Sequence, residues 1–503
     1  MLPIMFRKEA GRSYDMFLLQ GTAEDTMPTE NQGIRFGTDG WRAIMCDAFT
    51  FANVRIVVQA IASYLLDKRK AEKGVVIGYD ARFLAERFAE EAAKVMLANG
   101  IKVYMMPEDA PTPVVAYAVT LCQSAGAVMF TASHNPPEYN GIKYIPEYAG
   151  PASEDITSAI EANLSGSIPP GAKTLELEQA RQQGQLEIID PRQEYFRHIS
   201  ELVDFEVIQQ SGLKIICDPM YASGRHYLPD ILRANGCQVE TIRGHRDPLF
   251  GGSLPEPTAK ELAPLADKVK TSGSHLGLAT DGDADRFGII DGTGKYITPN
   301  QVIALLLVHL VEHKGYTGAV IRTVATTRLL DKLAEKYGLE LFETPVGFKH
   351  ICEHMRTRPV IIGGEESGGL SIGTHIPEKD GILANLLIAE LQAVRGKDLS
   401  ELLGEIMAEV GFFSSQRIDL RYPEEMKATL VRGLVSDPPK EIAGRQVVQV
   451  IAIDGAKLIL DDGSWFLVRP SGTEPLLRVY LEGGSEAAVE KLGAAVTKFV
   501  ESH

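Results

Sequence analysis

The sequence predicts a four-domain protein, with three α/β domains followed by a smaller domain of the α+β class. Its 503 residues are enough for three or four domains of about 150 residues each. Over the first three quarters of the chain, short apolar runs alternate with segments of helical periodicity, which is the order of βαβ units in a mostly parallel sheet. The last quarter instead contains a strand–turn–strand pattern and a terminal helix.

The first domain has the clearest alternation. Helical periodicity is expected over residues 53–66 and 85–99, and strands over residues 74–79 and 102–105. The apolar run AGAVMF at residues 125–130 predicts one more buried strand, which ends in a polar loop.

Two further units repeat this plan. The second has expected strands at 213–217, 238–242 and 276–279 and expected helices at 191–202 and 228–235. The third has expected strands at 319–321 and 359–362 and expected helices at 301–312 and 328–337. No strict sequence repeat is visible, so triplication of one core is a structural hypothesis.

The C-terminal quarter predicts a different architecture. Strands at 457–460 and 465–468 flank the turn Asp461-Asp462-Gly463 and form an expected β-hairpin. Another strand at 477–481 precedes a helix at 486–500. We therefore expect domains at 31–185, 186–298, 299–412 and 413–503, with residues 1–30 as a flexible N-terminal extension of no assigned role.

Composition excludes some classes of protein. Hydrophobic residues make up 45% and charged residues 23%, as in ordinary globular proteins. The net charge of -16 disfavours binding to nucleic acid, although a local cationic pocket can still bind a small anion. The five cysteines form no CxxC pair, which favours reduced thiols, and the longest apolar stretch is too short to cross a bilayer. We expect a cytoplasmic protein with no membrane partner.

The most informative motif is TASHNP at residues 131–136, followed by NGIKY at residues 140–144. It places a hydroxyl (Ser133), an imidazole (His134) and an amine (Lys143) just after a buried strand. Ligands of open α/β sheets bind beyond the carboxyl ends of the strands. Ser133 is therefore a candidate to carry a covalent group, and His134 is either a catalytic residue or a structural cap.

A second motif, DGDADR at residues 281–286, places Asp281, Asp283 and Asp285 at alternate positions after a strand. In an extended backbone these side chains project to one side and repel each other unless a cation lies between them. Hard oxygen ligands favour Mg²⁺ or Ca²⁺ over Zn²⁺, and the EF-hand pattern is absent because Arg286 and Gly292 occupy its glycine and glutamate positions. The alternative is a solvated acidic turn.

Two more loops have residue types that bind sugars or phosphates. In GGEESGG at residues 363–369, Glu365 and Ser367 can hydrogen-bond to sugar hydroxyls, and the glycines permit close approach of a ligand. In RPSGTEP at residues 469–475, a guanidinium, two hydroxyls and a glycine turn match a phosphate monoester. Each loop could also be an ordinary turn.

Other segments carry weaker signals. Arg42 could contact an anion or lie on a surface turn, and Lys349 could be a solvated cation. The Asp80 and Arg82 pair is expected to support a loop. A phosphorylatable serine, an acidic trio, a hydroxyl-binding loop and a phosphate loop together favour phosphoryl transfer on a sugar phosphate, which depends on positioning and charge neutralisation.

The motifs TASHNP, DGDADR, GGEESGG and RPSGTEP, in this order from about residue 34 to the C-terminus, resemble the α-D-phosphohexomutase superfamily, which includes phosphoglucomutases and phosphomannomutases. The resemblance implies three similar mixed-sheet α/β domains plus a C-terminal α+β domain around a central active-site cleft. It implies that Ser133 is a phosphoserine whose phosphate completes a Mg²⁺ site with Asp281, Asp283 and Asp285.

The same resemblance implies roles for the other motif residues. The reaction centre is expected to include Ser133, His134, Lys143, Arg42 and Arg286. Substrate is expected to contact Lys349, Glu365, Ser367, Arg469, Ser471, Gly472 and Thr473. The implied reaction interconverts hexose 1-phosphate and hexose 6-phosphate through hexose 1,6-bisphosphate, which is both intermediate and activator. Either Lys143 or His134 is the general acid/base.

The resemblance leaves the sugar open. The GGEESGG loop is more similar to phosphoglucomutases than to the phosphoglucosamine branch, whose loop resembles GEQSGH, so glucose is the expected substrate. The alternatives are a phosphomannomutase, a dual-specificity enzyme and a phosphoglucosamine mutase. A Mg²⁺-dependent serine phosphatase needs no second phosphate site, and a non-catalytic binding relative would be expected to lose Ser133 or an acid of the trio, all of which are present.

Overall fold

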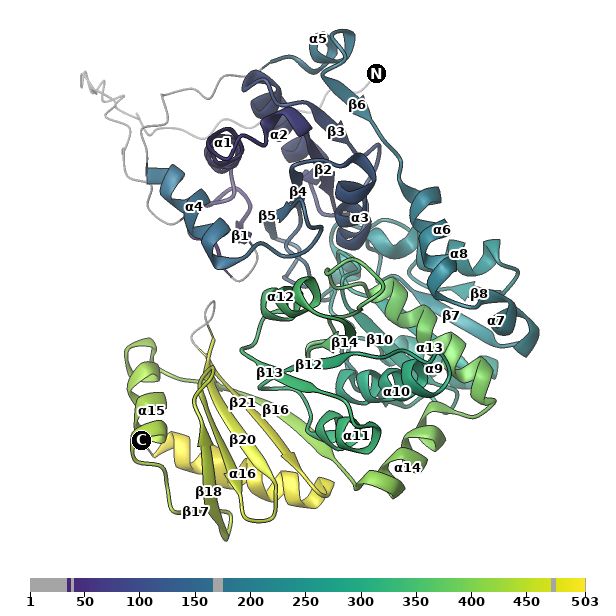
Figure 1. Cartoon of the computed structure of the whole chain (residues 1–503), viewed down its shortest axis with the longest axis vertical. Coiled ribbons are helices and arrows are strands. Elements are labelled where there is room, and N and C mark those ends of the chain that lie inside the picture. The colour runs from purple at the N-terminus through teal and green to yellow at the C-terminus, as the bar shows by residue number, and fades with distance from the viewer. Residues whose placement is uncertain (1–33, 38–39, 166–174, 472–475, 503) are drawn as a thin grey trace, which may run out of the picture. The chain divides into compact units, whose positions relative to one another are not determined.

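The framework of the protein is a set of four β-sheets (Figure 1). A computed structural model describes residues 34–37, 40–165, 175–471 and 476–502, and residues 35–503 form one unit. The expected N-terminal extension at residues 1–30 lies outside the described residues.

The first sheet has six strands in the order β1-β5-β4-β2-β3-β6. Strands β4, β2, β3 and β6 are parallel, whereas β5 pairs antiparallel with β4 and β1. The strands are β1 (Gly40–Ile44), β2 (Val75–Tyr79), β3 (Val103–Met105), β4 (Gly126–Phe130), β5 (Tyr139–Pro146) and β6 (Leu186–Ile188). The helices are α1 (Phe51–Asp67), α2 (Ala85–Ala98), α3 (Thr112–Cys122), α4 (Glu154–Ser165) and α5 (Leu177–Gln182).

The second sheet has the order β11-β10-β9-β7-β8, and the third has the order β13-β12-β14-β15. The second domain contains β7 (Lys214–Asp218), β8 (Gln238–Thr241), β9 (Leu276–Thr280), β10 (Phe287–Asp291), β11 (Tyr296–Ile297), α6 (Arg192–Leu202), α7 (Phe205–Ser211), α8 (Leu228–Ala234) and α9 (Ala263–Ser272). The third contains β12 (Ala319–Thr323), β13 (Leu341–Thr344), β14 (Val360–Gly364), β15 (Leu370–Ile372), α10 (Pro299–Glu312), α11 (Leu329–Tyr337), α12 (Phe348–Thr357), α13 (Gly381–Arg395) and α14 (Leu399–Val410).

The three sheets share one core, as the sequence predicted. Each has a parallel trio, β3-β2-β4, β8-β7-β9 or β13-β12-β14. The last strand of each trio turns back as an antiparallel hairpin with β5, β10 or β15. We name the three hairpin connections the serine turn (131–138), the aspartate turn (281–286) and the glutamate turn (365–369). Three of the four motifs singled out in the sequence therefore occupy the same position of one repeated core.

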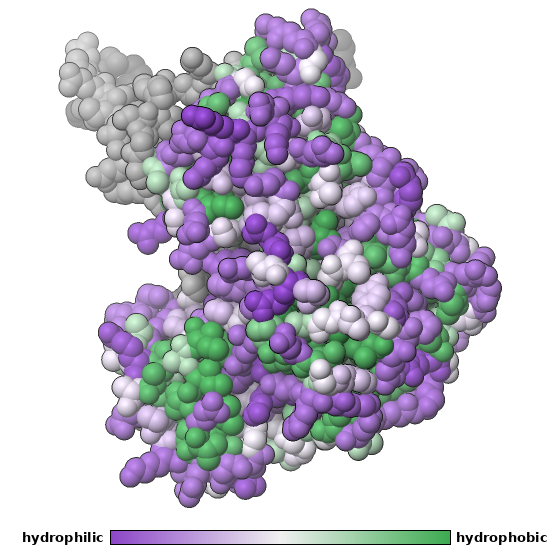
Figure 2. Space-filling model, in the orientation of Figure 1, coloured by the Kyte–Doolittle hydropathy of each residue, from purple (hydrophilic) through white to green (hydrophobic). Residues whose placement is uncertain are grey.

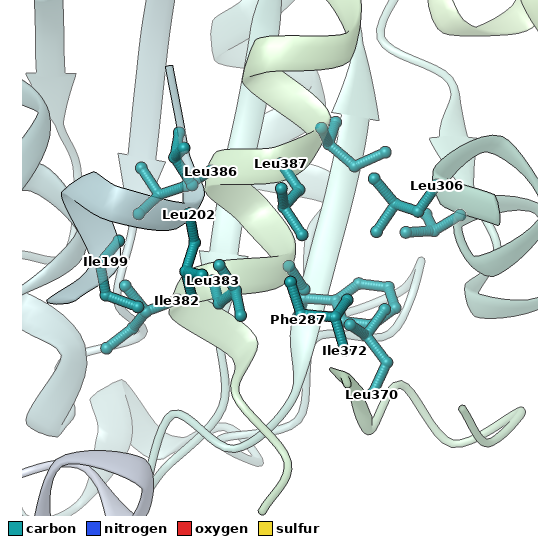
Figure 3. Close-up of a cluster of buried hydrophobic side chains, with 14 of the residues drawn as sticks. Ile199, Leu202, Phe287, Leu306, Leu370, Ile372, Ile382, Leu383, Leu386 and Leu387 are labelled. Atoms are coloured by element: carbon teal, nitrogen blue, oxygen red, sulfur yellow. The ribbon is translucent and has the colours of Figure 1, made fainter. Parts of the chain in front are cut away.

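Helix α13 joins the second and third domains. Its residues from Gly381 to Gln392 are buried, and in Figure 3 its leucines lie between Ile199 and Leu202 of α6 and Phe287 of β10. Burial of each large aliphatic side chain contributes about 1.5–3 kcal/mol. A shared helix of this kind fixes the aspartate and glutamate turns relative to each other.

The C-terminal domain has the fourth sheet, with the order β16-β21-β20-β19-β18-β17 and antiparallel pairing throughout. Its elements are β16 (Ser414–Arg421), β17 (Glu441–Ile442), β18 (Arg445–Ile451), β19 (Ala456–Leu460), β20 (Trp465–Pro470), β21 (Leu476–Gly483), α15 (Glu424–Ser436) and α16 (Glu486–Glu501). The predicted hairpin is confirmed as β19–β20, and the α+β class of this domain is confirmed with it.

Hydrophilic residues cover much of the face shown in Figure 2, and hydrophobic residues gather over the strands of the C-terminal domain. The exposed large hydrophobic residues of this domain include Val448 and Ile453. Among the residues that the structure describes, no helix is long and apolar enough to cross a membrane.

Several elements, among them α3 and α13, were not predicted from the sequence, and two differences have a clear physical reason. Strand β5 was not predicted because Asn140, Gly141 and Pro146 are typical of turns. It forms because β4 and β1 supply partners on both sides, and Gly141 is needed since a Cβ there would lie 2.4 Å from the Thr131 carbonyl oxygen. Helix α10 begins at Pro299, two residues before the prediction, because Thr298 forms a capping box with Gln301.

Candidate active site

The serine, aspartate and glutamate turns meet at one place. The Ser133 hydroxyl donates to Asp281 Oδ2 at 3.0 Å, across the boundary between the first and second domains. A Cβ at Gly282 would lie 2.4 Å from the Ser133 carbonyl oxygen, so glycine permits this approach. On its other side the aspartate turn forms a β-bridge between Arg286 and Gly369. The repeated hairpins thus bring three separate motifs together.

Ser133 has an unusual backbone conformation. Its φ of 51° lies in the left-handed region, which is uncommon for residues other than glycine. The Thr131 hydroxyl accepts the Ser133 N–H at 2.8 Å and stabilises this conformation. The serine is only 2% exposed, and strained residues of this kind concentrate at functional sites.

The imidazole of His134 lies next to this hydroxyl, with Nδ1 3.3 Å from Ser133 Oγ. Burial, followed by the positive charges of Arg286 and Arg42, lowers the pKa of His134 well below its ordinary value. The neutral form of the ring is therefore favoured.

The side chain of Arg82 stabilises the serine turn through hydrogen bonds to its backbone. Its Nη2 donates to the carbonyl oxygens of Ser133 and Asn135, both at 2.7 Å. Its Nη1 donates to the carbonyl oxygens of Pro136 at 2.8 Å and Tyr139 at 3.0 Å. The guanidinium is fully buried and thus replaces the water that these carbonyl groups would otherwise bind. The predicted supporting role of this residue agrees with these contacts.

We expect Arg82→Lys to lower both Tm and kcat, the latter by about tenfold or more. A lysine has three donors on one atom and cannot reproduce the four bonds of the planar fork. Each buried carbonyl left without a donor costs about 1–3 kcal/mol. Thermal unfolding and steady-state assays check this, with Arg87→Lys on the exposed face of α2 as the matched control. Wild-type Tm and kcat in Arg82→Lys would contradict the role.

The aspartate turn brings Asp281, Asp283 and Asp285 together as predicted. One carboxylate oxygen of each lies within 4.8 Å of the others, and all three residues are buried. Asp283 accepts from the Thr112 hydroxyl at 2.6 Å and from Lys143 Nζ at 2.9 Å. This arrangement is a candidate metal site.

The environments of these carboxylates differ. Burial, followed by the charges of Asp283 and Asp285, raises the pKa of Asp281 well above its ordinary value. Burial acts in the same direction on Asp283, but the Lys143 ammonium and the hydrogen bonds from Thr112 and Lys143 outweigh it and hold the pKa of Asp283 far below its usual range. Among the described residues, Asp283 Oδ1 and Asp285 Oδ1 have no hydrogen-bond partner although both are buried. A cation would satisfy these oxygens and relieve the repulsion.

Four cationic side chains surround the carboxylates and the serine turn. Lys143 Nζ lies 3.2 Å from Asp285 Oδ2, and Lys379 Nζ lies 3.2 Å from the same oxygen. Arg42, on β1, donates to Asn135 Oδ1 at 2.9 Å. Arg286 donates to Glu256 Oε1 at 3.0 Å. Together they form a positive rim suited to an anionic group on Ser133.

The glutamate turn and Lys349 form a neighbouring group. Glu365 Oε1 accepts the Gly347 N–H at 3.0 Å, which ties the turn to the segment before α12. Lys349 lies in the first turn of α12 with Nζ 3.6 Å from Glu154 Oε2. Ser367 is half-buried in the same turn.

The predicted phosphate loop begins at the end of β20. Arg469 Nε donates to Asp454 Oδ2 at 2.7 Å, and the Ser471 N–H donates to the Leu476 carbonyl oxygen at 2.9 Å. Gly472 and Thr473, also predicted in this loop, lie outside the described residues.

Comparisons with known proteins match all four domains. Models of the phosphoglucomutase/phosphomannomutase α/β/α domains I, II and III match residues 33–167, 193–294 and 298–410, and the model of the C-terminal domain matches residues 430–499. A phosphoglucomutase/phosphomannomutase of Thermococcus kodakarensis is 31% identical over 90% of this chain and 95% of that protein. The chain belongs to the phosphoglucomutase/phosphomannomutase family.

Two other relatives of this phosphohexomutase differ in the sugars that they are named for. A phosphoglucosamine/phosphogalactosamine mutase of Sulfurisphaera tokodaii is 30% identical over 93% of this chain and 99% of that protein. A crystal structure from Thermus thermophilus, provisionally named a phosphomannomutase, is 34% identical with a TM-score of 0.82, over 93% of this chain and 99% of that chain. The protein is therefore an isomerase that transfers a phosphoryl group within its substrate, and the predicted family is confirmed.

Several residues around the site of this phosphohexomutase were not predicted. Lys379 and Glu378 precede α13, with Nζ of Lys379 3.1 Å from Glu378 Oε1, and Thr112 begins α3. These residues lie outside the motifs found in the sequence. Lys379 and Thr112 reach the carboxylates of the aspartate turn only when the domains pack against each other, so the sequence alone does not indicate the contacts. The charged pair Glu378-Lys379, directly before the N-cap Asp380 of a long apolar helix, is the one local signal that could have suggested them.

The buried carboxyl group of Glu365 should make the free energy of unfolding of this phosphohexomutase depend on pH. Burial, followed by the charge of Glu366, raises the pKa of Glu365 from 4.5 to about 7. The folded state thus binds this proton more tightly than the unfolded state, and its contribution to stability falls as the pH rises from 4.5 towards 7. Glu365→Gln mimics the protonated acid and should raise the free energy of unfolding at pH 8 by up to about 3 kcal/mol, with a higher Tm, and by much less at pH 5. Thermal melts at both pH values check this, with exposed Glu353→Gln as the control. Equal shifts at both pH values would contradict it.

Proposed function

We propose that this enzyme interconverts hexose 1-phosphate and hexose 6-phosphate, with glucose as the preferred sugar, through a phosphorylated Ser133 and a hexose 1,6-bisphosphate intermediate. The observation that carries the proposal is the buried Ser133 hydroxyl, 3.0 Å from Asp281, which belongs to a trio of buried carboxylates. A phosphoryl group on this oxygen would face the four cations of the rim. That environment suits the storage and release of a phosphoryl group.

The residues present fit a magnesium ion. Three carboxylates offer hard oxygen ligands, and two of their buried oxygens have no hydrogen-bond partner among the described residues. Asp281, Asp283, Asp285 and the phosphate of Ser133 would hold the ion. Bound Mg²⁺ would supply neutralisation of the charge that develops on the transferred group.

The first transfer breaks the phosphorus–oxygen bond of phosphoserine and forms one to the free hydroxyl of the hexose phosphate. The hydroxyl proton moves to a base of the site, and the serine oxygen leaves as an alkoxide that takes up a proton. Neutral His134, 3.3 Å from Ser133 Oγ, is placed to exchange the serine proton. Lys143 is held by two carboxylates and remains a charge that orients the transferred group.

The second transfer returns the other phosphate of the intermediate to Ser133 after the sugar has reversed. During both transfers the non-reacting phosphate would bind Arg469 and Ser471, with Gly472 and Thr473 in the same loop. Glu365, Ser367 and Lys349 would bind the sugar hydroxyls and the substrate side of the site. The GGEESGG form of the glutamate turn supports glucose as the sugar.

A coupled assay tests the proposal. Glucose 1-phosphate, mannose 1-phosphate and glucosamine 1-phosphate are compared with Mg²⁺ and a catalytic amount of the matching hexose bisphosphate. We expect the highest kcat/KM for glucose 1-phosphate and a lag without the bisphosphate. Isomerisation of none of the three sugars would refute the proposal, and a preference for mannose or glucosamine would refute its assignment of the sugar.

A further inference from the structure

The side chain of Asp454 joins two parts of the site that belong to different domains. Its Oδ2 accepts from Arg469 Nε at 2.7 Å, on the phosphate loop of the C-terminal domain. The same oxygen accepts from the Val346 N–H at 3.1 Å, in the segment before α12 of the third domain. The next N–H of that segment, from Gly347, donates to Glu365. Two successive N–H groups therefore connect the Asp454 carboxylate, which binds Arg469, to the Glu365 carboxylate of the glutamate turn.

The surrounding backbone is built for this contact. Asp454 lies in the turn between β18 and β19, where Gly455 has a φ of 87°. A Cβ at Gly455 would lie 2.5 Å from the Val468 carbonyl oxygen and 3.2 Å from the Cα of Arg469, so only glycine lets the turn pack against the end of β20. Gly347 has a φ of 126°, which is also suited to glycine. Both partners of the bridge thus depend on a glycine beside them.

The third and C-terminal domains are held together next to the bridge. Lys457, three residues after Asp454, donates to the Val324 carbonyl oxygen at 2.8 Å and to Glu343 at 3.0 Å. Trp465 and Tyr480 pack with Val324 in one buried cluster. The bridge therefore lies at the edge of an ordered interface.

The geometry of the guanidinium indicates what the bridge does. Asp454 occupies Nε, and among the described residues Nη1 and Nη2 of Arg469 have no hydrogen-bond partner. An arginine bound through Nε presents its two terminal nitrogens as a bidentate edge, which matches two phosphate oxygens. The side chain of Arg469 is 19% exposed and that of Asp454 is 24% exposed, so both remain accessible to a ligand.

We propose that Asp454 is a positioning residue for substrate binding, an inference that rests on the proposed function of Arg469. Asp454 orients the guanidinium towards the non-reacting phosphate and fixes its distance from the residues that bind the sugar. Its carboxylate touches Arg469 and a backbone amide, not the reacting atoms. Its loss should weaken binding of the substrate more than it slows the chemical step.

The test compares Asp454→Ala and Asp454→Asn with Asp461→Ala, an exposed carboxylate in the next turn of the same domain. The full-length, Mg²⁺-loaded enzyme is assayed with its preferred hexose 1-phosphate, and inorganic phosphate serves as a sugar-free probe. We expect Asp454→Ala to raise KM and the inhibition constant of phosphate by about tenfold each, with kcat changed by less than about threefold. Asp454→Asn keeps the shape and one acceptor, so its effects should be smaller. Asp461→Ala should match the wild type.

The proposal would be overturned if KM and the inhibition constant of phosphate in Asp454→Ala lie within twofold of the wild-type values. A fall in kcat with KM unchanged would overturn it as well. If Asp454→Ala is unstable, Asp454→Asn decides by the same criteria.

Thermal shift with inorganic phosphate separates this inference from the proposed function. Phosphate should raise the Tm of the wild type more than that of Asp454→Ala, and equal shifts would overturn the bridge even in an enzyme that isomerises hexose phosphates. A wild type that isomerises none of the sugars would refute the proposed function instead.

Discussion

Ser133→Ala is expected to lower turnover of hexose 1-phosphate by at least about a thousandfold, because the proposed carrier of the phosphoryl group is removed. The substitution deletes a buried hydroxyl that bonds to Asp281, but the four bonds from Arg82 to the turn involve only backbone oxygens and remain. The variant should therefore fold, with a Tm close to that of the wild type. Circular dichroism and thermal unfolding check this point.

The same variant also tests whether Ser133 itself carries the phosphoryl group. Intact-mass and peptide mass spectrometry should find a phosphoryl group on Ser133 in part of the wild-type protein and none at this position in Ser133→Ala. Ser200→Ala, at an exposed position of α6, is the matched control and should keep both activity and phosphate. Residual turnover above about one per cent in Ser133→Ala would refute the assigned role.

Asp281→Asn and Asp283→Asn should both lower kcat by at least about a hundredfold, because each removes a proposed metal ligand. Their effects on the stability of the metal-free protein should have opposite signs. The pKa of Asp281 is raised in the folded state, so its ionised form destabilises the fold above the ordinary pKa of 3.8, and Asn removes this cost. The pKa of Asp283 is lowered, so its ionised form stabilises the fold above 3.8, and Asn forfeits the pairing with Lys143, which costs about 2 kcal/mol or more.

Thermal unfolding at pH 8, in EDTA and in saturating Mg²⁺, measures both effects. In EDTA we expect a higher Tm for Asp281→Asn and a lower Tm for Asp283→Asn than for the wild type. Mg²⁺ at a hundred times its dissociation constant should stabilise the wild type by about 2.7 kcal/mol and the variants much less. Asp267→Asn, exposed on α9, is the control. Shifts of the same sign in EDTA, or undiminished stabilisation by Mg²⁺, would contradict the assignment.

Most of the fold was predictable because its signals are local. Parallel strands such as β2, β9 and β14 are short apolar runs that end at a charged residue, and the predicted helices around them have clear periodicity. The sequence also predicted that a loop of polar or charged residues follows each of the strands β4, β9 and β14. Strand β5 was not predicted, because its pairing comes from distant strands and its own sequence favours a turn.

The site was predictable to the extent that it lies on motif loops. Ser133 and the carboxylates of the aspartate turn are brought together as expected. Lys379 and Thr112 were not predicted, because each reaches its partner only through packing between domains. Asp454 was not predicted either, because its contact with the Val346 N–H also forms between domains and its contact with Arg469 joins two separate turns of the C-terminal domain. Arg82 was predicted only to support its own loop. No local sequence pattern indicates that its guanidinium donates to four carbonyl oxygens between residues 133 and 139, about fifty residues further along the chain.

The placement of the serine, aspartate and glutamate turns at one position of a repeated core has a consequence for how such enzymes diversify. In the proposed mechanism each copy of the core keeps the same hairpin and gives it a separate task, namely carrying the phosphoryl group, holding the cation or binding the sugar. If these proposed roles hold, substitutions in residues 365–369 should alter which sugar is accepted while the serine and aspartate turns stay as they are. Selection for a new substrate and selection for catalytic rate can act on different copies.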